Sequence, residues 1–342
     1  MVRMLAGWSL PPAAAIGVFV AVPTAVAQIV ATPPIEPGTY TKIAVPSATT
    51  VAEGINDSGV IVGCFQRKTG PERGFIDHHG KFTIITDPAA ATSRAGITCP
   101  AGIDNAGAIV GQYRDRSGRL HGFVYQNRKF RTIDEPKAGH RSGQGTTAVE
   151  INKAGVIVGY YVTSKGLEKG FIFRNGAFTT VTHPAADSLG LGTALNGIAD
   201  DGTISGLYED VRGRVHGFWY RKGIFHKIDV PGAHQTEVVC ISERSGLIVG
   251  SYQPRSGAGH RSFTYHQGVF RTLPHPVGSV DAFPQCGNDR SRIVGYYFTN
   301  RNRNRIVAFK FTPGNASADA INQRGQPSPS GAAPITVRTG RP

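Results

Sequence analysis

Short apolar runs alternate with polar turn sequences along most of the chain. One stretch, residues 102–136, reads GIDNAGAIVGQYRDRSGRLHGFVYQNRKFRTIDEP. The first apolar run ends in GID, and the next three are AIVGQY, LHGFVYQ and FRTID. The polar segments NAG, RDRSGR and NRK separate these four runs. Runs of this length bounded by Gly, Asn and Asp predict β-strands joined by turns, and the closing proline cannot continue a ladder. The pattern predicts a unit of four short strands.

This unit recurs six times. Each copy contains a glycine that ends an IVG motif or a variant of it, at Gly63, Gly111, Gly159, Gly206, Gly250 and Gly295. A phenylalanine of a Gly-Phe motif or its variant follows in every copy, at Phe75, Phe123, Phe171, Phe218, Phe263 and Phe309. Units of about 45 residues with four strands each predict an all-β fold, a six-bladed β-propeller of four-stranded blades. A straight solenoid is the main alternative, but its repeats are usually shorter.

The two ends of the repeat array fit together. The sixth copy, Cys286–Gly314, stops without a fourth strand, while Gly38–Pro46 (GTYTKIAVP) has the sequence of a fourth strand without a copy of its own. We expect this N-terminal strand to complete the last blade, because closing the ring removes the exposed edges of an open array. The propeller is therefore assigned to residues 38–314.

The segments outside the repeats have other compositions. Residues 1–27 combine Arg3, the apolar run Ala13–Val22 and AVA before Gln28, which is the pattern of a secretory signal peptide. An uncleaved N-terminal anchor is the alternative. Residues 28–37 form a Pro-rich lead, and residues 315–342 lack apolar periodicity, which predicts a disordered tail. We expect a secreted, monomeric protein, in the periplasm or the medium, with no transmembrane segment after signal removal.

Four cysteines, Cys64, Cys99, Cys240 and Cys286, lie in the repeats, and their spacing matches no metal-binding motif. An extracytoplasmic compartment permits disulfides, and four cysteines allow three pairings. Cys240 and Cys286 occupy matching positions in neighbouring copies, and Cys99 in the second copy can meet Cys64 in the first. These positions favour the pairs Cys64–Cys99 and Cys240–Cys286, with four buried thiols as the alternative. We expect no metal and no other cofactor.

The third strands carry a family signature. LHGF (Leu120–Phe123) and VHGF (Val215–Phe218), together with GINDSGVIVG (Gly54–Gly63), resemble the extracellular HAF-repeat family of bacterial proteins, which is named for a His-Ala-Phe tripeptide. Here glycine replaces the alanine, and only His121 and His216 keep the histidine. The resemblance spans all six copies. It implies a secreted propeller-like repeat protein and no particular activity.

The connections between strands divide between two faces of such a ring. The turns joining first to second and third to fourth strands lie on one face, which we call the turn face. The loops joining second to third strands, and the connections to the next copy, lie on the other, the loop face. Every second-to-third loop contains Lys or Arg, and the net charge of the chain is +14. A basic surface on a secreted protein favours an anionic partner, and variable loops on a rigid ring often carry binding sites.

The candidate ligand-binding residues come from the loop face. They are basic or aromatic residues of its loops, connections and strand ends: Arg116, Arg119, His140, Arg141, Tyr161, Arg214, His234, Arg255, Arg301 and Arg303. An anionic polysaccharide is the preferred ligand, because arginine contacts carboxylates in a bidentate manner and aromatic rings stack on sugars. A solvated rim that only maintains solubility is the alternative.

Three other sets of repeated residues have structural explanations. An aromatic residue near the end of each second strand favours packing between blades, with sugar stacking as the alternative: Phe65, Tyr113, Tyr161, Tyr208, Tyr252 and Tyr297. Polar residues after the first strands are typical turn formers, with a repeated calcium site as the weaker alternative: Asn56, Asp57, Asp104 and Asn152. Polar residues in the first strands are expected along a central channel: Glu53, Glu150, Asn196, Glu237 and Gln285.

No local motif indicates an enzyme. Nucleophile elbows, zinc-binding histidine pairs, phosphate-binding loops and dinucleotide fingerprints are absent from the sequence. Propeller enzymes assemble their sites from single residues of several blades, so a polysaccharide lyase or glycosidase is the second hypothesis. Its base would be His140, His234 or Tyr161, and Arg255 would neutralise a carboxylate. A protein-interaction platform is the third hypothesis, and specific nucleic-acid binding is not expected.

Overall fold

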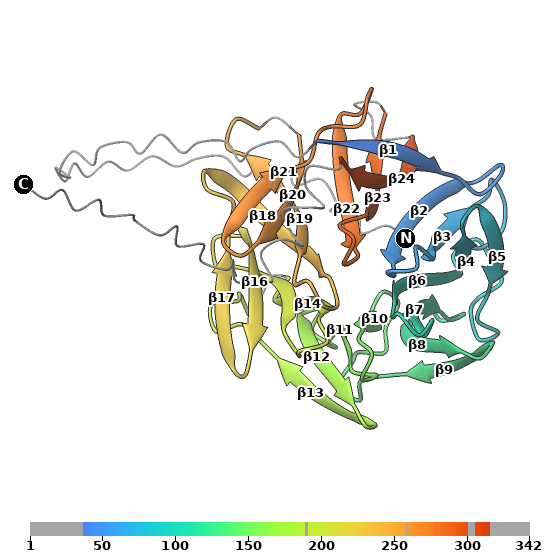
Figure 1. The fold of residues 1–342 in the computed structure, drawn as a ribbon. Coiled ribbons are helices and arrows are strands. Elements are labelled where there is room, and N and C mark those ends of the chain that lie inside the picture. Colours follow the sequence, from blue (N-terminus) through green and yellow to red (C-terminus); the bar gives the residue numbers. More distant parts are fainter. Residues whose placement is uncertain (1–36, 189–190, 258, 300–304, 315–342) are drawn as a thin grey trace, which may run out of the picture.

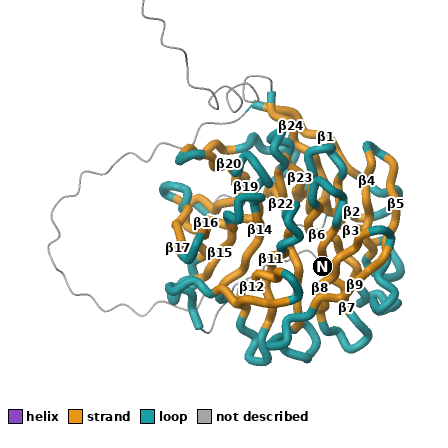
Figure 2. Tube along the Cα trace, turned by 60° about the horizontal axis from the view of Figure 1, so that its bottom comes forward, coloured by secondary structure: helices purple, strands orange, loops and turns teal. Residues whose placement is uncertain are grey.

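Strands and their connections make up the whole of the chain that the computed structural model describes, which is residues 37–188, 191–257, 259–299 and 305–314 (Figures 1 and 2). Within these ranges no helix has the length and hydropathy of a membrane span. The described strands form six antiparallel blades of four strands around a common axis (Figure 1), which confirms the propeller prediction. The expected signal peptide and C-terminal tail lie outside the described residues.

Each blade is a meander of consecutive strands, apart from the sixth. Blades 1 to 3 comprise β2 (Thr49–Ile55), β3 (Ile61–Gln66), β4 (Arg73–His78), β5 (Lys81–Ile85); β6 (Ile97–Ile103), β7 (Ile109–Arg114), β8 (Leu120–Gln126), β9 (Lys129–Ile133); and β10 (Gly145–Ile151), β11 (Ile157–Val162), β12 (Glu168–Arg174), β13 (Ala177–Val181). Blades 4 to 6 comprise β14 (Thr193–Ile198), β15 (Ile204–Glu209), β16 (Val215–Arg221), β17 (Ile224–Ile228); β18 (Ala233–Ile241), β19 (Ile248–Pro254), β20 (Arg261–His266), β21 (Val269–Thr272); and β22 (Asp281–Gly287), β23 (Ile293–Phe298), β24 (Ile306–Pro313), β1 (Gly38–Ile43). Blades 2 and 3 also touch through one parallel pair, Gly145 with Leu120.

The N-terminal strand closes the ring as the repeat pattern predicts. β1 pairs with β24 in an antiparallel register that runs from Gly38 opposite Pro313 to Ile43 opposite Ala308. Blade 6 therefore contains three strands from the C-terminal end of the array and one from its N-terminal end (Figure 1). This arrangement pairs the edge of β24 and leaves no gap between the first and last blades.

The repeated glycine of the second strand marks a close approach. A Cβ atom on Gly63 would meet the carbonyl oxygen of Val51 and the ring of Phe75. Phe75 and its five counterparts are fully buried, and Phe75 packs edge-to-face on Phe82 of the outer strand at 5.5 Å between ring centroids. The two sequence landmarks are thus one packing unit: the small residue leaves space that the aromatic ring fills.

Every first strand contains a β-bulge at the same place. In blade 1 the register shifts between Ala52 and Gly54, so Glu53 has no partner residue on β3. The same shift leaves one extra residue in each of the other blades: Ala101, Val149, Asn196, Val239 and Gln285. A bulge redirects the side chains around it. Here it occurs on the innermost strand of each blade, beside the channel.

The apolar core lies between blades. One cluster joins Val62, Ile76 and Ile85 of blade 1 to Ile103 and Phe123 of blade 2. Burial of side chains of this kind stabilises a fold by about 1.5–3 kcal/mol each. Because each blade covers the face of its neighbour, the ring is a rigid platform for the connections on both faces.

Candidate functional site

The loop face presents cations to solvent. Five basic side chains of its second-to-third loops are exposed and form no ion pair with any described residue: Lys68, Arg116, Lys165, Arg212 and Arg255. These side chains come from five different blades. The rigid strands on either side fix where each loop begins and ends, so the positive charges are distributed around the ring rather than gathered at one point.

Of the ten predicted binding residues, eight lie in the described part of the chain, and five of these are exposed on this face. Arg116, His140, Arg141, His234 and Arg255 are exposed. Two others are half-buried and engaged in ion pairs: Arg119 Nη2 lies 3.7 Å from Asp134 Oδ2, and Arg214 Nη2 lies 3.4 Å from Asp210 Oδ2. Arg301 and Arg303 lie outside the described residues.

The prediction that Tyr161 contacts a ligand is wrong for this structure. Its side chain is 1% exposed and lies in the core cluster between blades. Its hydroxyl group is 3.2 Å from the Thr180 hydroxyl, so both the ring and its polar end already have partners. Packing between blades, which the sequence favoured for this repeated aromatic position, is confirmed. The burial of Tyr161 also excludes a lyase that uses the Tyr161 hydroxyl as its base, because the hydroxyl cannot reach a substrate.

A histidine in blade 2 is held between two aspartates. His121 Nδ1 lies 2.7 Å from Asp134 Oδ2, and His121 Nε2 lies 3.1 Å from Asp115 Oδ2. The ring stacks on Tyr113 at 4.8 Å between centroids. The hydrogen bond to Asp134 raises the pKa of His121, burial opposes this, and the bond to Asp115 adds to the rise. Burial also opposes ionisation of Asp115, yet hydrogen bonds from Ser117 and His121 lower its pKa to about 2. A ring with a carboxylate at each nitrogen favours the imidazolium form.

Blade 4 repeats this arrangement. His216 lies 2.7 Å from Asp229 and 3.1 Å from Asp210. Blades 2 and 4 are the two copies that keep the histidine, and they alone have an aspartate six residues before it and another thirteen residues after it. The other copies have none of the three residues. This co-occurrence is the sequence signal that could have predicted the contact. The family resemblance explains the two histidines alone and does not point to their aspartates.

The acidic residues of the loop face are largely turned inward. Four aspartates bind the two histidines, and four further carboxylates are buried and accept backbone N–H groups: Asp87, Glu135, Glu209 and Asp281. Hydrogen-bond donors offset part of the negative potential of these carboxylates, while the five exposed loop cations named above pair with no described residue. The exposed charge of the loop face is therefore predominantly positive.

The turn face carries both acidic and basic side chains: Arg244 pairs with Asp57 and Asp289, and Lys153 pairs with Asp200. One residue from each first-to-second turn surrounds the channel mouth: Asp57, Asn105, Lys153, Asp200, Glu243 and Asp289. Asn105 Nδ2 donates to Glu243 across the mouth at 2.6 Å and to Asp57 at 2.9 Å. Burial, followed by the charges of Asp200 and Asp104, raises the pKa of Glu243 to about 7. A cavity of about 20 Å³ beneath this ring has room for one water molecule.

Three of the four turn formers predicted from the sequence act as such, while the Asp57 carboxylate instead accepts from Asn105, Arg244 and Asp289 of other blades. Asn56 Oδ1 accepts from the backbone N–H of Val60, and Asp104 Oδ1 accepts from the N–H groups of Ala106 and Ala108. Asn152 Oδ1 makes the equivalent bond to Val156. These side-chain oxygens serve the turns themselves, which explains their recurrence without a bound ion.

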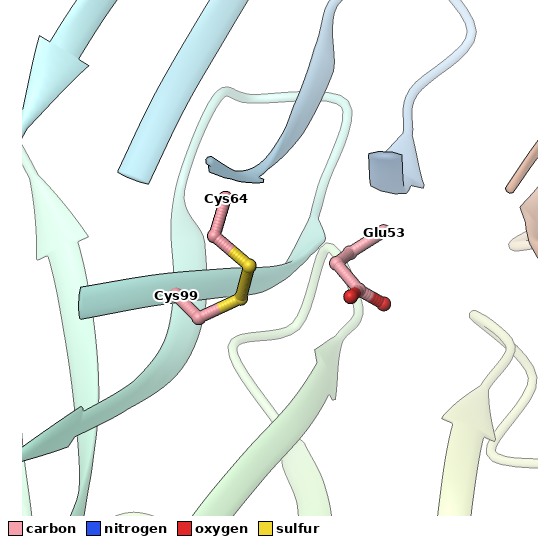
Figure 3. A group of neighbouring side chains, drawn as sticks. All are labelled: Glu53, Cys64 and Cys99. Atoms are coloured by element: carbon pink, nitrogen blue, oxygen red, sulfur yellow. A yellow bond between two sulfur atoms is a disulfide. The ribbon is translucent and has the colours of Figure 1, made fainter. Parts of the chain in front are cut away.

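The two disulfides form as the repeat positions suggested. Cys64 of β3 bonds to Cys99 of β6, and Cys240 of β18 bonds to Cys286 of β22, so each disulfide joins neighbouring blades. A glutamate accompanies each one: the carboxylate of Glu53 lies within 4.8 Å of both sulfurs of the first pair (Figure 3). The sulfurs bond to each other and so offer no thiolate to a metal. Burial raises the pKa of Glu53 to about 7.

Glu150 has the matching place beside the second disulfide. Its Oε2 atom lies 3.6 Å from Cys286 Sγ, although the two residues belong to blades 3 and 6. The Glu150 side chain therefore reaches across the channel to the opposite blade. Burial raises the pKa of this carboxyl well above its usual range. The predicted channel position of Glu150 is confirmed.

Comparison with known proteins gives likeness in fold alone. No protein-family model matches the chain, and no curated protein sequence matches it. Among solved structures, the SapL1 lectin in complex with alpha methyl fucoside is 14% identical, with a TM-score of 0.50, over 80% of this chain and 96% of the lectin. The Aleuria aurantia lectin, described as a six-bladed β-propeller, is 11% identical with a TM-score of 0.44, over 80% of this chain and 98% of the lectin. A gluconolactonase from Xanthomonas campestris is 13% identical with a TM-score of 0.44, over 84% of this chain and 99% of the gluconolactonase.

Proposed function

We propose that the protein is a binding protein for an acidic extracellular polysaccharide, and that the loop face is its binding surface. The observation that carries this proposal is the set of exposed cations on the loop face that pair with no described residue. These cations come from five blades, while most carboxylates of the loop face are held by histidines and backbone N–H groups. These exposed cations attract a polyanion to the loop face.

An acidic polysaccharide fits this surface better than a small anion does. Exposed cations from several blades give a repeating ligand several weak contacts, and their combination yields an affinity that no single contact has. Arginine side chains such as Arg116, Arg212 and Arg255 can each bind a sugar carboxylate through two parallel hydrogen bonds. The sugar complex of SapL1, which has a similar fold, supports a saccharide as the ligand class.

We also propose that the protein is secreted, acts as a monomer and is a member of the HAF-repeat family. The signal-like N-terminal sequence and the two disulfides support an oxidising compartment outside the cytoplasm. The histidine of the family signature has a structural part in blades 2 and 4, where it holds the second-to-third loop to the end of the fourth strand.

Reversing the charge of exposed loop-face arginines tests the binding surface. The triple variant Arg116→Glu, Arg212→Glu, Arg255→Glu should fold normally, because none of the three side chains pairs with a described residue. Its affinity for an acidic polysaccharide such as polygalacturonate should fall at least about ten-fold at low salt, since each contact contributes on the order of 1 kcal/mol. Calorimetric or interferometric titration at two salt concentrations measures the effect, and wild-type binding should weaken as salt rises.

A matched variant separates location from net charge. Arg174→Glu, Lys222→Glu, Arg290→Glu changes the net charge by the same amount with exposed residues of the turn-face side. This variant should bind almost as well as wild type. Equal losses in the two triple variants would mean that only net charge matters, and the loop face would then not be the site. Binding that is insensitive to salt and to both variants would instead indicate a protein partner.

Polysaccharide cleavage is a second candidate function, favoured by Glu53. This carboxyl lies beside the Cys64–Cys99 disulfide (Figure 3), and burial raises its pKa to about 7, a value suited to a general acid or base. The binding experiment distinguishes the two functions when product is followed during the titration. New absorbance from unsaturated ends, or new reducing ends, would replace the binding function with a lyase or a glycosidase.

A further inference from the structure

A second surface feature lies away from the loop-face arginines, in a groove between blades 1 and 2. β5 and β9 are outer strands of these two blades (Figure 1). The groove has a volume of about 550 Å³ and is lined by residues of both strands and their connections. Ile84 and Pro88 line it from blade 1, and Tyr125, Arg128, Lys129 and Phe130 line it from blade 2. We call it the blade 1–2 groove.

Arg128 has an unusual backbone conformation at the end of this groove. It is the second residue of the two-residue turn that joins β8 to β9, with Gln126 paired opposite Lys129. Asn127 and Arg128 have φ angles of 52° and 61°, the left-handed values that such hairpin turns require. The other four turns between third and fourth strands have glycine at the second position: Gly80, Gly176, Gly223 and Gly268.

Glycine adopts this conformation readily, whereas a residue with a side chain adopts it at a cost. Four copies of the turn use the favourable residue, and one copy uses arginine. An arginine kept in this conformation motivates the hypothesis that its side chain has a use at that position. Since Arg128 lines the groove, the groove is the place to look for that use.

The groove combines cations with apolar surface. Arg128 and Lys129 are exposed and pair with no acidic residue among the described ones, and no carboxylate lines the groove. Ile84 is 41% exposed, and Tyr125 and Phe130 are half-buried with ring centroids 4.6 Å apart. The groove is thus positively charged at one end and apolar along its length.

The corresponding junctions elsewhere in the ring lack this combination. Between blades 4 and 5, Gly268 and Val269 stand where Arg128 and Lys129 stand here, and the residue equivalent to Ile84 is Lys227, which pairs with Asp229 at 2.8 Å. Between blades 3 and 4 the two cationic positions hold Gly223 and Ile224. A feature confined to one of six similar junctions is not required by the repeat architecture.

We infer that the blade 1–2 groove binds a single carboxylate-bearing sugar unit. The Arg128 guanidinium is suited to bind the carboxylate through two hydrogen bonds, with Lys129 adding charge. The rings of Tyr125 and Phe130 and the side chain of Ile84 offer apolar surface to the less polar face of the sugar. The choice of a sugar rests on the proposed function. The site itself does not, because none of its residues belongs to the loop-face set.

The substitution Arg128→Gly tests this inference. It removes the guanidinium and gives the turn the residue that the other four copies use, so the melting temperature should equal that of wild type or exceed it by up to about 3 °C. Affinity for methyl glucuronide, measured by ligand-observed NMR titration, should fall at least about ten-fold. Wild type should bind methyl glucuronide in preference to methyl glucoside, which lacks the carboxylate.

Lys222→Asn is the matched control, because it removes one cation from the equivalent turn of blade 4, and it should leave glucuronide affinity unchanged. Unchanged glucuronide affinity in Arg128→Gly would overturn the inference, as would equal binding of the two methyl glycosides. If wild type binds neither glycoside but still binds polygalacturonate through the loop-face arginines, the groove site is wrong and the proposed function stands. If wild type binds the glucuronide while the loop-face variants leave polygalacturonate binding unchanged, the groove site stands and the loop face is not the binding surface.

Discussion

At the scale of single residues, His121 connects the charge of the loop face to pH. Its two hydrogen-bonded aspartates hold the second-to-third loop of blade 2 against the end of β9, and that loop carries Arg116 and Arg119. The arrangement depends on a proton, because a neutral ring can donate from only one of its two nitrogens. Loss of the proton therefore removes one of the two contacts that keep the loop in place.

The sign of the pH effect follows from the direction of the pKa shift. Folding raises the pKa of His121 above its ordinary value of 6.5. A group of this kind contributes its full stability below the unfolded pKa and loses it as pH rises through the folded pKa. We expect His121→Gln to lower the free energy of unfolding by about 1–2 kcal/mol near pH 5.5 and by less at a pH about two units above the folded pKa. Denaturant unfolding at both pH values measures the two differences.

His140→Gln provides the comparison for this prediction, because His140 is exposed on the same face and has no bond of this kind. Its effect on stability should be small at both pH values. A His121→Gln destabilisation that is equal at the two pH values would mean that the imidazole acts by packing on Tyr113 rather than through its charge.

At the scale of strands, the six blades act as internal replicates of one another. In blades 2, 3 and 5 the tyrosine of the second strand bonds to a threonine of the fourth, as in Tyr161 with Thr180 at 3.2 Å. Blade 1 has Phe65 and Ile84 at the same two positions. The hydroxyl groups are present together or absent together in these four blades, because a buried hydroxyl without a partner is costly.

A double-mutant cycle in blade 3 tests this pairing. Thr180→Ile alone should cost about 1–2 kcal/mol of unfolding free energy, since it leaves the Tyr161 hydroxyl without a partner. Tyr161→Phe with Thr180→Ile reproduces the blade 1 pair, and it should cost less than the sum of the single changes by about 1 kcal/mol. Chemical denaturation of the four proteins gives the coupling. Additive costs, within about 0.3–0.5 kcal/mol, would show that the two side chains act independently.

At the scale of the whole molecule, the sequence predicts the ring far better than the site. Strand positions, blade number and both disulfides follow from the repeat, because each copy must bury the same face against its neighbour. Tyr161 was misplaced as a binding residue because alternation along a strand does not reveal which blade covers it. The inward-facing carboxylates depend on side-chain contacts such as that of His121 with Asp134, and their shared occurrence in two copies becomes meaningful only when the contact is seen. Arg128 can be noticed in the sequence, because four other copies have glycine at this position. Only the structure shows that it lines a groove.

Ring closure supplies the last prediction. β1 pairs along β24, Tyr40 packs on Phe309 and Phe311 at 4.9 and 5.0 Å between ring centroids, and its hydroxyl donates to the Pro274 carbonyl of blade 5 at 2.6 Å. Deleting residues 38–46 removes these contacts and exposes the edge of β24. We expect a loss of at least about 4 kcal/mol, together with a tendency to associate through the free edge. Thermal unfolding and size-exclusion chromatography measure the two effects.

A circular permutant isolates the closing strand from its place in the chain. Pro313 lies opposite Gly38 in the β24–β1 pair, as Gln126 lies opposite Lys129 in blade 2, so an Asn-Gly turn can join the two strands directly. A chain that begins at residue 47 and ends with residues 38–46 after this turn should regain the stability that the deletion removes. If the deletion leaves the melting temperature unchanged, or if the permutant is no more stable than the deletion, then β1 does not hold the ring closed.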